Sequence, residues 1–263
     1  MRFGTAPAGR DRTGSDPILV AEGLSKRFGG FAAVDDVTLR VARGSIHALI
    51  GPNGAGKTTC FNLLTKTIAP SAGRITFDGH DITGLRSAEV ARRGLVRSFQ
   101  ISATFPNLTA LENVRVALQR PFGRSLQFWR SLGAIRELDE EAEDLLEKVN
   151  LQESRDVLAG GLSYGKKRAL EIATTLALKP DIMLLDEPTA GMGHEDVGPI
   201  AELIRETARG RTVLLVEHNL SVVADLCDRI TVLQHGRILA EGTYGEVSSD
   251  ARVVEAYIGA TDA

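Results

Sequence analysis

A glycine-rich loop is the segment of this 263-residue chain whose residue types are best suited to chemistry. Thr59 supplies a hydroxyl directly after the loop, which reads Gly51-Pro52-Asn53-Gly54-Ala55-Gly56-Lys57-Thr58. Glycines allow the backbone to curl so that successive N–H groups point at phosphate oxygens. Lys57 would place a positive charge on the β- and γ-phosphates, and the Thr58 hydroxyl can ligate Mg²⁺. The loop therefore predicts a site for a nucleotide and Mg²⁺.

Two adjacent carboxylates form the second chemical feature. Asp186 and Glu187 follow the apolar run Ile182–Leu185, so Asp186 stands at the end of a predicted buried strand. There Asp186 would hold Mg²⁺, directly or through water, and Glu187 would polarise an attacking water. The alternative is a pair of acids that caps a turn before Pro188. The glycine loop upstream favours the catalytic interpretation.

The elements around these residues alternate between strands and helices. The apolar spacing of Thr58–Thr67 predicts a helix packed on a sheet. Apolar or alternating patterns predict strands at Val37–Val41, Ser45–Ile50, Arg74–Phe77, Ile182–Leu185 and Val213–Val216. The last two are continuously apolar, as in strands that helices cover on both faces. This order predicts an α/β fold with a mostly parallel sheet.

The middle of the chain differs from both ends. From Pro106 to Leu158 the patterns are helical and predict no strand. Residues 86–136 contain nine arginines and two glutamates, whereas residues 137–156 contain nine acids and two basic residues. These blocks are interpreted either as solvated helix faces or as a basic stretch that lies near anionic lipid headgroups or an acidic partner.

The amino-acid composition limits the kinds of partner and environment that the protein could have. Hydrophobic residues make up 43% of the chain, enough for one sizeable core, and the net charge of −3 gives no reason to expect nucleic acid as a partner. Cys60 and Cys227 fit a reduced cytosolic protein, with a single disulfide as the alternative. No segment approaches the ~20 apolar residues that span a bilayer. Residues 1–16 lack a signal-peptide core and are expected to form a flexible leader.

The pentapeptide Leu162-Ser163-Tyr164-Gly165-Lys166 adds information about the family. Placed after the glycine loop and before Asp186, it resembles the signature loop of ATP-binding-cassette ATPases. The resemblance implies a P-loop NTPase (RecA-like) core with a mostly parallel sheet, an antiparallel β edge and an inserted helical subdomain. The implied boundaries are a leader at 1–16 and an ATPase domain at 17–259. Within this domain the resemblance implies the core at 17–100 and 160–241, the helical subdomain about 101–159 and a helical appendage at 242–259.

The same resemblance assigns roles to single residues. Phe28 corresponds to the aromatic that stacks on adenine, with an ordinary core aromatic as the alternative. Gln100 corresponds to the glutamine that reaches Mg²⁺ and the attacking water, in a loop that contacts a membrane subunit. His218 corresponds to the switch histidine at the γ-phosphate. Ser163 and Gly165 would bind the γ-phosphate of ATP held by another copy of the fold.

Two residues depart from the usual family pattern. Lys166 stands where glutamine is more usual, and Gly193 stands at the aspartate position of the loop that follows Glu187. Both lie where the second ATPase subunit is expected to make contact. They favour a partner that is a paralogue over a second identical copy.

Several runs narrow the resemblance to the larger ATPase subunit of high-affinity branched-chain amino acid importers. These runs are Arg93–Gln100, Phe105–Thr109, Glu112–Val114, the insertion around Phe122–Ala134 and the ending Val253–Gly259. Such importers combine two related ATPases, two membrane permeases and a periplasmic solute-binding protein. The resemblance therefore implies a cytoplasmic subunit, peripheral on the inner face of the cell membrane, whose Mg²⁺-dependent hydrolysis of ATP drives import.

Other functions within and beyond this family stay open at this point. Urea and other amide importers share nearly the same pattern, and the cassette alone does not exclude export, for example of lipid. A soluble cassette ATPase that acts on DNA or ribosomes would be expected to carry coiled-coil arms, paired cassettes or a basic tail, which the sequence lacks. A binding-only regulatory module would lack Glu187 and His218.

Overall fold

Two β-sheets form the body of the protein in the computed structural model, which describes residues 16–98, 104–119 and 132–258. The larger sheet has six strands in the order β10-β9-β3-β8-β7-β6. Its strands are β3 (Ile46–Ile50), β6 (Leu95–Arg97), β7 (Ile182–Asp186), β8 (Thr212–Val216), β9 (Arg229–Gln234) and β10 (Arg237–Gly242). All pairings in it are parallel except that of β10 with β9. The mostly parallel sheet expected from the sequence is confirmed.

The smaller sheet is wholly antiparallel, with the strand order β2-β1-β4-β5. Its strands are β1 (Pro17–Phe28), β2 (Phe31–Ala42), β4 (Ala72–Phe77) and β5 (His80–Asp81). The predicted strands at 37–41 and 74–77 lie inside β2 and β4. The antiparallel part is thus more extensive than an edge, because β1 and β2 form a long hairpin that builds a sheet of its own.

Helix α1 (Lys57–Leu64) lies in the hydrophobic core that the two sheets share. Its Phe61 and Leu64 pack in one cluster with Leu24 of β1, Ile75 of β4 and Leu49 of β3. Alternate residues of β3 point to the opposite face and join a second cluster with the remaining helices. This alternation follows from the two-residue period of a strand. It explains why β3, β7 and β8 are buried along their whole length.

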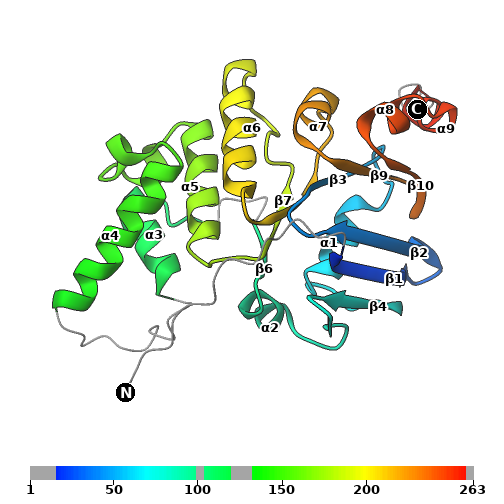
Figure 1. Ribbon diagram of the computed structural model, residues 1–263, viewed down its shortest axis with the longest axis horizontal. Helices are drawn as coiled ribbons and strands as arrows, with labels where there is room; N and C mark the ends of the chain where they lie inside the picture. Colours follow the sequence, from blue (N-terminus) through cyan, green and yellow to red (C-terminus); the bar gives the residue numbers. More distant parts are fainter. Residues whose placement is uncertain (1–15, 99–103, 120–131, 259–263) are drawn as a thin grey trace.

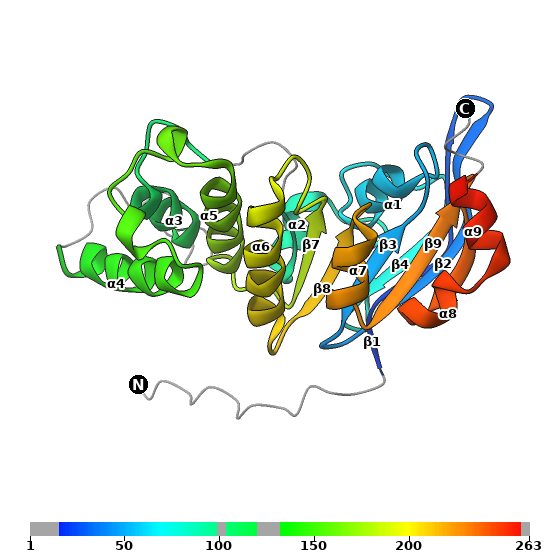
Figure 2. The same cartoon turned by 90° about the horizontal axis from the view of Figure 1, so that it is seen from above.

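Helices cover the second face of the larger sheet. They are α5 (Tyr164–Leu176), α6 (His194–Ala208) and α7 (Leu220–Leu226), which stand side by side along the sheet in Figures 1 and 2. The C-terminal helices α8 (Tyr244–Ser248) and α9 (Ala251–Ile258) lie beside β9 and β10. Both helices follow residue 242, and the domain boundaries expected from the sequence stay predictions.

The middle of the chain forms helices at one end of the molecule, away from the hairpin of β1 and β2 (Figure 2). α3 (Ala110–Leu118) and α4 (Leu132–Lys148) pack against each other and against α5, while α2 (Ser87–Arg92) precedes β6. Between 104 and 158 the described residues contain no strand, only an isolated bridge from Thr109 to Leu158. α3 starts with a capping box in which the Thr109 hydroxyl accepts a hydrogen bond from the Glu112 N–H.

Ion pairs connect the acidic residues of α4 with basic residues in and around this helical region, including one arginine of the basic block. Arg115 of α3 pairs with Asp139 of α4 at 2.6 Å. Arg155 pairs with Glu143 at 2.5 Å, and Lys179, which follows α5, pairs with Glu141 at 2.8 Å. The acidic face of α4 is therefore partly neutralised within the chain itself.

Cys60 and Cys227 are both free thiols, so the disulfide considered from the sequence is not formed. Among the described segments, no helix has both the length and the apolar character that crossing a bilayer requires. Residues 1–15, most of the expected leader, lie outside the described part of the chain.

His47 makes the stability of the fold depend on pH. Its side chain lies fully buried on β3, where Nε2 is 2.8 Å from the Thr231 hydroxyl. Burial lowers the pKa of His47 from 6.5 to about 4, and the nearby Glu241 carboxylate opposes this shift. Between these pH values the unfolded chain binds a proton that the folded chain excludes. Stability therefore falls as the pH drops from about 6.5 towards 4.

We expect His47 to lower the free energy of unfolding by about 2 kcal/mol between pH 7 and pH 5. Denaturant unfolding of the wild type and of His47→Gln at the two pH values measures this contribution, which the variant should lose. His80→Gln, at an exposed histidine, is the matched control and should keep the full pH dependence. An identical pH slope in the wild type and His47→Gln would contradict the prediction.

Candidate nucleotide-binding site

The glycine loop joins β3 to α1 at the carboxyl edge of the parallel sheet. β3 ends at Ile50, α1 begins at Lys57, and Gly56 is the residue before the helix. Gly51, Gly54 and Gly56 have φ angles of 150°, 77° and 100°, which residues with a side chain rarely adopt. The curled loop leads into the N-terminus of α1, where free N–H groups and the helix dipole favour an anion.

Close packing against neighbouring strands is a second reason for glycine in this loop. A Cβ at Gly51 would lie 2.2 Å from the Leu233 carbonyl oxygen, and a Cβ at Gly56 would lie 2.4 Å from that of Ala33. A Cβ at Gly54 would meet no atom within 4 Å. Strands β9 and β2 thus fix the two ends of the loop, while its middle is open for a ligand to approach.

We expect Gly56→Ala to destabilise the fold more than Gly54→Ala does. Both substitutions place alanine at a positive φ, which costs roughly 1–2 kcal/mol. Only Gly56→Ala also forces β2 to move, and overpacking of this kind adds about 2 kcal/mol. Thermal or urea unfolding of the two variants gives the difference directly, since the pair shares the loop and the chemical change. Equal losses of stability would show that the contact with Ala33 carries no cost.

Lys57 folds back over the loop. Its Nζ donates to the carbonyl oxygens of Gly51 at 2.6 Å and Pro52 at 2.9 Å. Burial lowers the pKa of Lys57, while the negative charge of Glu187 acts in the opposite direction. The two predicted site residues therefore lie close enough to interact electrostatically. Thr58 is exposed and Thr59 half-buried at the start of α1.

The C-terminal helix reaches the other side of the glycine loop. Tyr257 of α9 lies close to the backbone of Gly51. Burial raises the pKa of its hydroxyl to about 12, and the Gly51 backbone acts in the opposite direction. A cavity of about 540 Å³ lies between the loop and α9, and its lining includes Asn53, Gly54, Arg252 and Glu255. Residues near both ends of the chain therefore lie beside the loop: Ala33 of β2 beside Gly56, and residues of α9 across the cavity.

Asp186 ends β7 with its side chain only 2% exposed. Its Oδ2 forms an ion pair with Nη2 of Arg97, which follows from the pairing of β6 with β7. Arg97 also donates to Oδ1 of Asn62 on α1 at 2.5 Å, and its guanidinium lies 5.8 Å from the Phe61 ring centroid. A buried carboxylate requires a positive partner, and here the chain supplies one.

The donors at this edge fit Mg²⁺. Asp186 provides a carboxylate that already sits against a cation, and Thr58 provides an exposed hydroxyl. Hard oxygen donors of this kind suit Mg²⁺, which usually completes its shell with water and phosphate oxygens. Across the described residues no group of three or more His, Cys, Asp or Glu side chains forms a metal site of its own. The residues therefore fit a metal that is held jointly with a nucleotide.

Glu187 follows Asp186 in an unusual backbone conformation. Its φ is 46°, in the left-handed region, and its side chain is half-buried. The Glu187 N–H donates to the Val216 carbonyl oxygen of β8 at 2.9 Å. This bond places the residue beside the strand that leads to His218. His218 itself is exposed directly after β8, as a residue that contacts a ligand must be.

Glu217, between β8 and His218, is a fully buried carboxylate that the sequence motifs did not reveal. Its Oε1 accepts from the Thr189 hydroxyl at 2.6 Å and from the Thr189 N–H at 3.0 Å. Its Oε2 accepts from the N–H groups of His218 at 3.0 Å and Asn219 at 3.2 Å. Glu217 therefore joins the loop after Glu187 to the segment that carries the histidine.

Phe28 lies at the tip of the hairpin of β1 and β2 with 51% of its surface exposed. The alternative of an ordinary core aromatic is therefore wrong. Phe31, 66% exposed, pairs with Phe28 across the hairpin, and Lys26 Nζ lies 5.2 Å above the Phe28 ring. An exposed ring of this kind offers a flat surface to a planar base.

The signature segment starts α5. Ser163 is the N-cap of this helix and accepts a hydrogen bond from the Lys166 N–H at 3.4 Å, while Gly165 lies in the first turn. The Lys166 side chain turns away from the helix start, because its Nζ donates to the Ser154 hydroxyl at 2.9 Å. Both views place α5 apart from α1. The fold therefore brings Glu187 close to Lys57 of the glycine loop, whereas the signature stands apart from that loop.

Two of the residues singled out in the sequence, Gln100 and Gly193, lie outside the described residues and at the start of α6, respectively. Gly193 is the N-cap of α6, and a Cβ there would lie 2.8 Å from the Glu195 carboxylate. Arg97, Glu217 and Arg168 contact the expected site residues, although the sequence motifs predict no role for any of the three. Only their buried partners in the folded chain reveal them.

Comparison with known proteins shows that the chain is similar to ATP-binding proteins of transporters. Residues 34–190 match the family model described as ABC transporter, and residues 237–263 match the one described as branched-chain amino acid ATP-binding cassette transporter. The high-affinity branched-chain amino acid transport ATP-binding protein BraF of Pseudomonas aeruginosa is 41% identical, over 93% of this chain and 99% of that protein. LivG of Escherichia coli, of the same description, is 38% identical with the same coverage.

A lipid-related exporter and solved cassettes are also similar. The lipopolysaccharide export ATP-binding protein LptB of Haemophilus influenzae is 37% identical over 92% of this chain and 97% of that protein. A nucleotide-free ATP-binding cassette from an ABC transporter superposes with a TM-score of 0.81 at 34% identity, covering 92% of this chain and 99% of that one. A dimeric bacterial ABC transporter cassette gives 0.72 at 26% identity, over 86% and 98%.

Proposed function

The chain belongs to the ABC transporter family of ATPases, and we propose that it is the subunit whose ATP hydrolysis powers the import of branched-chain amino acids. The observation that carries the substrate class is the match of residues 237–263 to the branched-chain amino acid cassette family. This segment includes α9, whose Arg252 and Glu255 line a cavity together with residues of the glycine loop. The similarity to a lipopolysaccharide exporter makes lipid export the second candidate.

The proposed site residues divide the work of hydrolysis. The glycine loop Gly51–Thr59 and Lys57 hold the phosphates, and Phe28 stacks on the adenine. Bound Mg²⁺ supplies positive charge on the phosphate oxygens, and Thr58, Asp186 and Gln100 would hold it. Glu187 orients the attacking water and accepts its proton, and the exposed His218 donates a hydrogen bond to the γ-phosphate.

ATPase cassettes of this family work as dimers, and a dimeric cassette is among the similar structures. In the arrangement proposed for this chain, Ser163 and Gly165 contact the nucleotide bound by the other subunit. The absence of a side chain at Gly193 and the diversion of Lys166 to Ser154 favour a paralogue as that subunit. Because ATP contacts both halves only in the closed pair, it favours closure.

A groove near the end of β6 is the proposed contact with the membrane permease. Its volume is about 230 Å³, and Ser98, Phe105, Val116 and Leu178 belong to its lining. Phe105 is 53% exposed and Val116 39% exposed, so apolar surface is open to a partner. Through the permease the subunit would lie on the inner, cytoplasmic face of the membrane. A periplasmic binding protein would act on the same complex from the other side.

Uptake of labelled leucine, isoleucine and valine tests the proposed function. Cells that lack this chain should lose uptake, the wild-type chain should restore it, and Lys57→Ala should not. Lys148→Ala, at an exposed lysine of α4, is the control and should restore uptake fully. Normal uptake of these amino acids in the deleted cells would refute the proposal. Loss of labelled urea uptake or of surface lipid instead would select one of the alternatives.

A further inference from the structure

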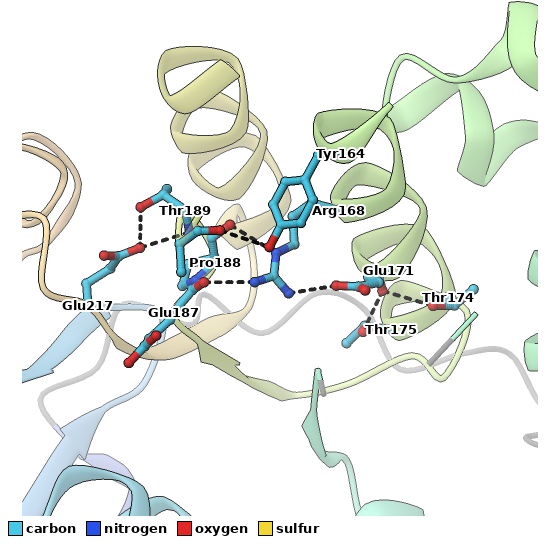
Figure 3. A network of polar contacts seen from close by, with 10 residues as sticks. Tyr164, Arg168, Glu171, Thr174, Thr175, Glu187, Pro188, Thr189 and Glu217 are labelled. Carbon is cyan, nitrogen blue, oxygen red and sulfur yellow. Dashed lines mark hydrogen bonds and ion pairs between the residues drawn. The ribbon is translucent and has the colours of Figure 1, made fainter. Parts of the chain in front are cut away.

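A buried arginine of the signature helix binds the backbone that carries Glu187. Arg168 of α5 is 6% exposed. Its Nη2 donates to the Glu187 carbonyl oxygen at 2.8 Å, and its Nε donates to that of Pro188 at 3.0 Å. Nη1 is directed to Oε2 of Glu171 at 2.6 Å, so the guanidinium lies between the loop and its own counter-ion (Figure 3).

The backbone at Glu187 needs such support. A left-handed conformation costs a residue with a side chain roughly 1–2 kcal/mol and persists only where the surroundings hold it. The Glu187 N–H is fixed by Val216 of β8, and the Glu187 carbonyl by Arg168. With the peptide groups on both sides of Cα fixed, these two contacts set the direction of the Cα–Cβ bond from which the carboxylate side chain extends.

Two further contacts hold the residues that follow. The Tyr164 hydroxyl of α5 donates to the Ala190 carbonyl oxygen at 2.9 Å. Thr189 is bound on the other side by Glu217. Figure 3 shows the segment 187–190 between α5 on one side and the end of β8 on the other. Side chains of α5 therefore donate hydrogen bonds to three carbonyl groups of this segment, those of Glu187, Pro188 and Ala190.

We infer that Arg168 is a positioning residue for Glu187, and that it couples the signature helix to the carboxylate that orients the attacking water. The inference rests on the proposed function, because it assigns Glu187 that role. α5 begins at Ser163, where nucleotide of the other subunit is proposed to bind, and Arg168 lies further along the same helix. A displacement of this helix on closure moves the Arg168 guanidinium and, with it, the backbone of Glu187.

Lysine does not replace arginine in this role. Arg168 uses three nitrogens of one plane towards three acceptors, whereas a lysine ammonium is a point charge on a flexible stem. Arg168→Lys keeps a positive charge beside Glu171 and so avoids a buried unpaired carboxylate. It gives up the paired contacts to Glu187 and Pro188. The conservative variant therefore separates charge balance from positioning.

The test compares steady-state ATP hydrolysis of the assembled transporter that contains wild-type chain, Arg168→Lys, Glu187→Gln or both changes. We expect Arg168→Lys to lower kcat by about ten- to a hundred-fold, since a misplaced catalytic group costs up to that factor. The KM for ATP and the affinity for a fluorescent ATP analogue should stay within about two-fold, since no phosphate contact changes. In the Glu187→Gln background, Arg168→Lys should add no further loss, because the two residues act through one carboxylate.

Lys167→Gln, on the same helix, is the matched control and should keep wild-type kcat. Tyr164→Phe, at a half-exposed side chain, is a second variant that keeps the test possible if Arg168→Lys does not fold. Loss of the hydrogen bond from Tyr164 to Ala190 should lower kcat about three-fold. Wild-type kcat in the folded variants, or losses that multiply in the double variant, would overturn the inference. Undiminished hydrolysis by Glu187→Gln alone would instead refute the part of the proposed function that makes Glu187 the proton acceptor.

Discussion

Glu187→Gln is expected to lower the turnover of ATP by about 10²- to 10⁴-fold, the usual contribution of a general base. The amide keeps the size of the side chain and can still accept a hydrogen bond, but it does not take a proton from water. Binding should survive, because the glycine loop and Lys57 are unchanged. Since ATP holds the closed pair together and is no longer consumed, ATP-bound dimers should accumulate. Phosphate release and light scattering measure the two effects.

Glu206→Gln is a suitable control, since it makes the same chemical change at an exposed position of α6. It should leave both hydrolysis and association at wild-type values. A second control, Lys57→Ala, should abolish nucleotide binding and with it the ATP-held dimer. Fast hydrolysis by Glu187→Gln would assign the proton acceptor to another residue. Slow hydrolysis without dimers would separate catalysis from closure.

Local patterns predict the central part of this fold well. The strands at 182–185 and 213–216 are continuous apolar runs, and both are fully buried in the parallel sheet. The helix after the glycine loop also begins where expected, because the loop fixes its start. The hairpin of β1 and β2 extends far beyond the predicted strand at 37–41. Its exposed positions and register shifts weaken the two-residue period on which such a prediction depends.

The proposed catalytic and phosphate-binding residues lie in short motifs, so the sequence alone is enough to propose them. Their supporting contacts are not predictable, because each joins distant positions. Arg97 and Asp186 are 89 positions apart, and Thr189 and Glu217 are 28 apart. From the sequence alone, Arg97 and Glu217 would be assigned to the surface, as most charged residues are. Their burial follows from the sheet order, in which β6 and β8 are the neighbours of β7. The fate of the Lys166 side chain likewise depends on Ser154, outside its own motif.

Arg97→Met is expected to lower the free energy of unfolding by about 3 kcal/mol, because it leaves Asp186 as a buried charge without its partner. The side chains of the pair are only 13% and 2% exposed, so water does little to screen the loss. Methionine fills much of the arginine volume next to Phe61, which limits the cavity. Urea unfolding at neutral pH measures the effect. Asp186→Asn in the same background should recover part of the stability, since it removes the unpaired charge.

The variant should also respond to Mg²⁺ in a way that the wild type does not. In the wild type the Arg97 guanidinium already neutralises Asp186, and millimolar Mg²⁺ without nucleotide should change the melting temperature little. In Arg97→Met the carboxylate is free to take a cation, so Mg²⁺ should raise the melting temperature, by the linkage of binding to stability. Asp186→Asn combined with Arg97→Met should abolish this response. If Mg²⁺ raises the melting temperatures of the wild type and of Arg97→Met equally, Arg97 does not occupy the cation position beside Asp186. The ion pair would then serve only to join β6 to β7.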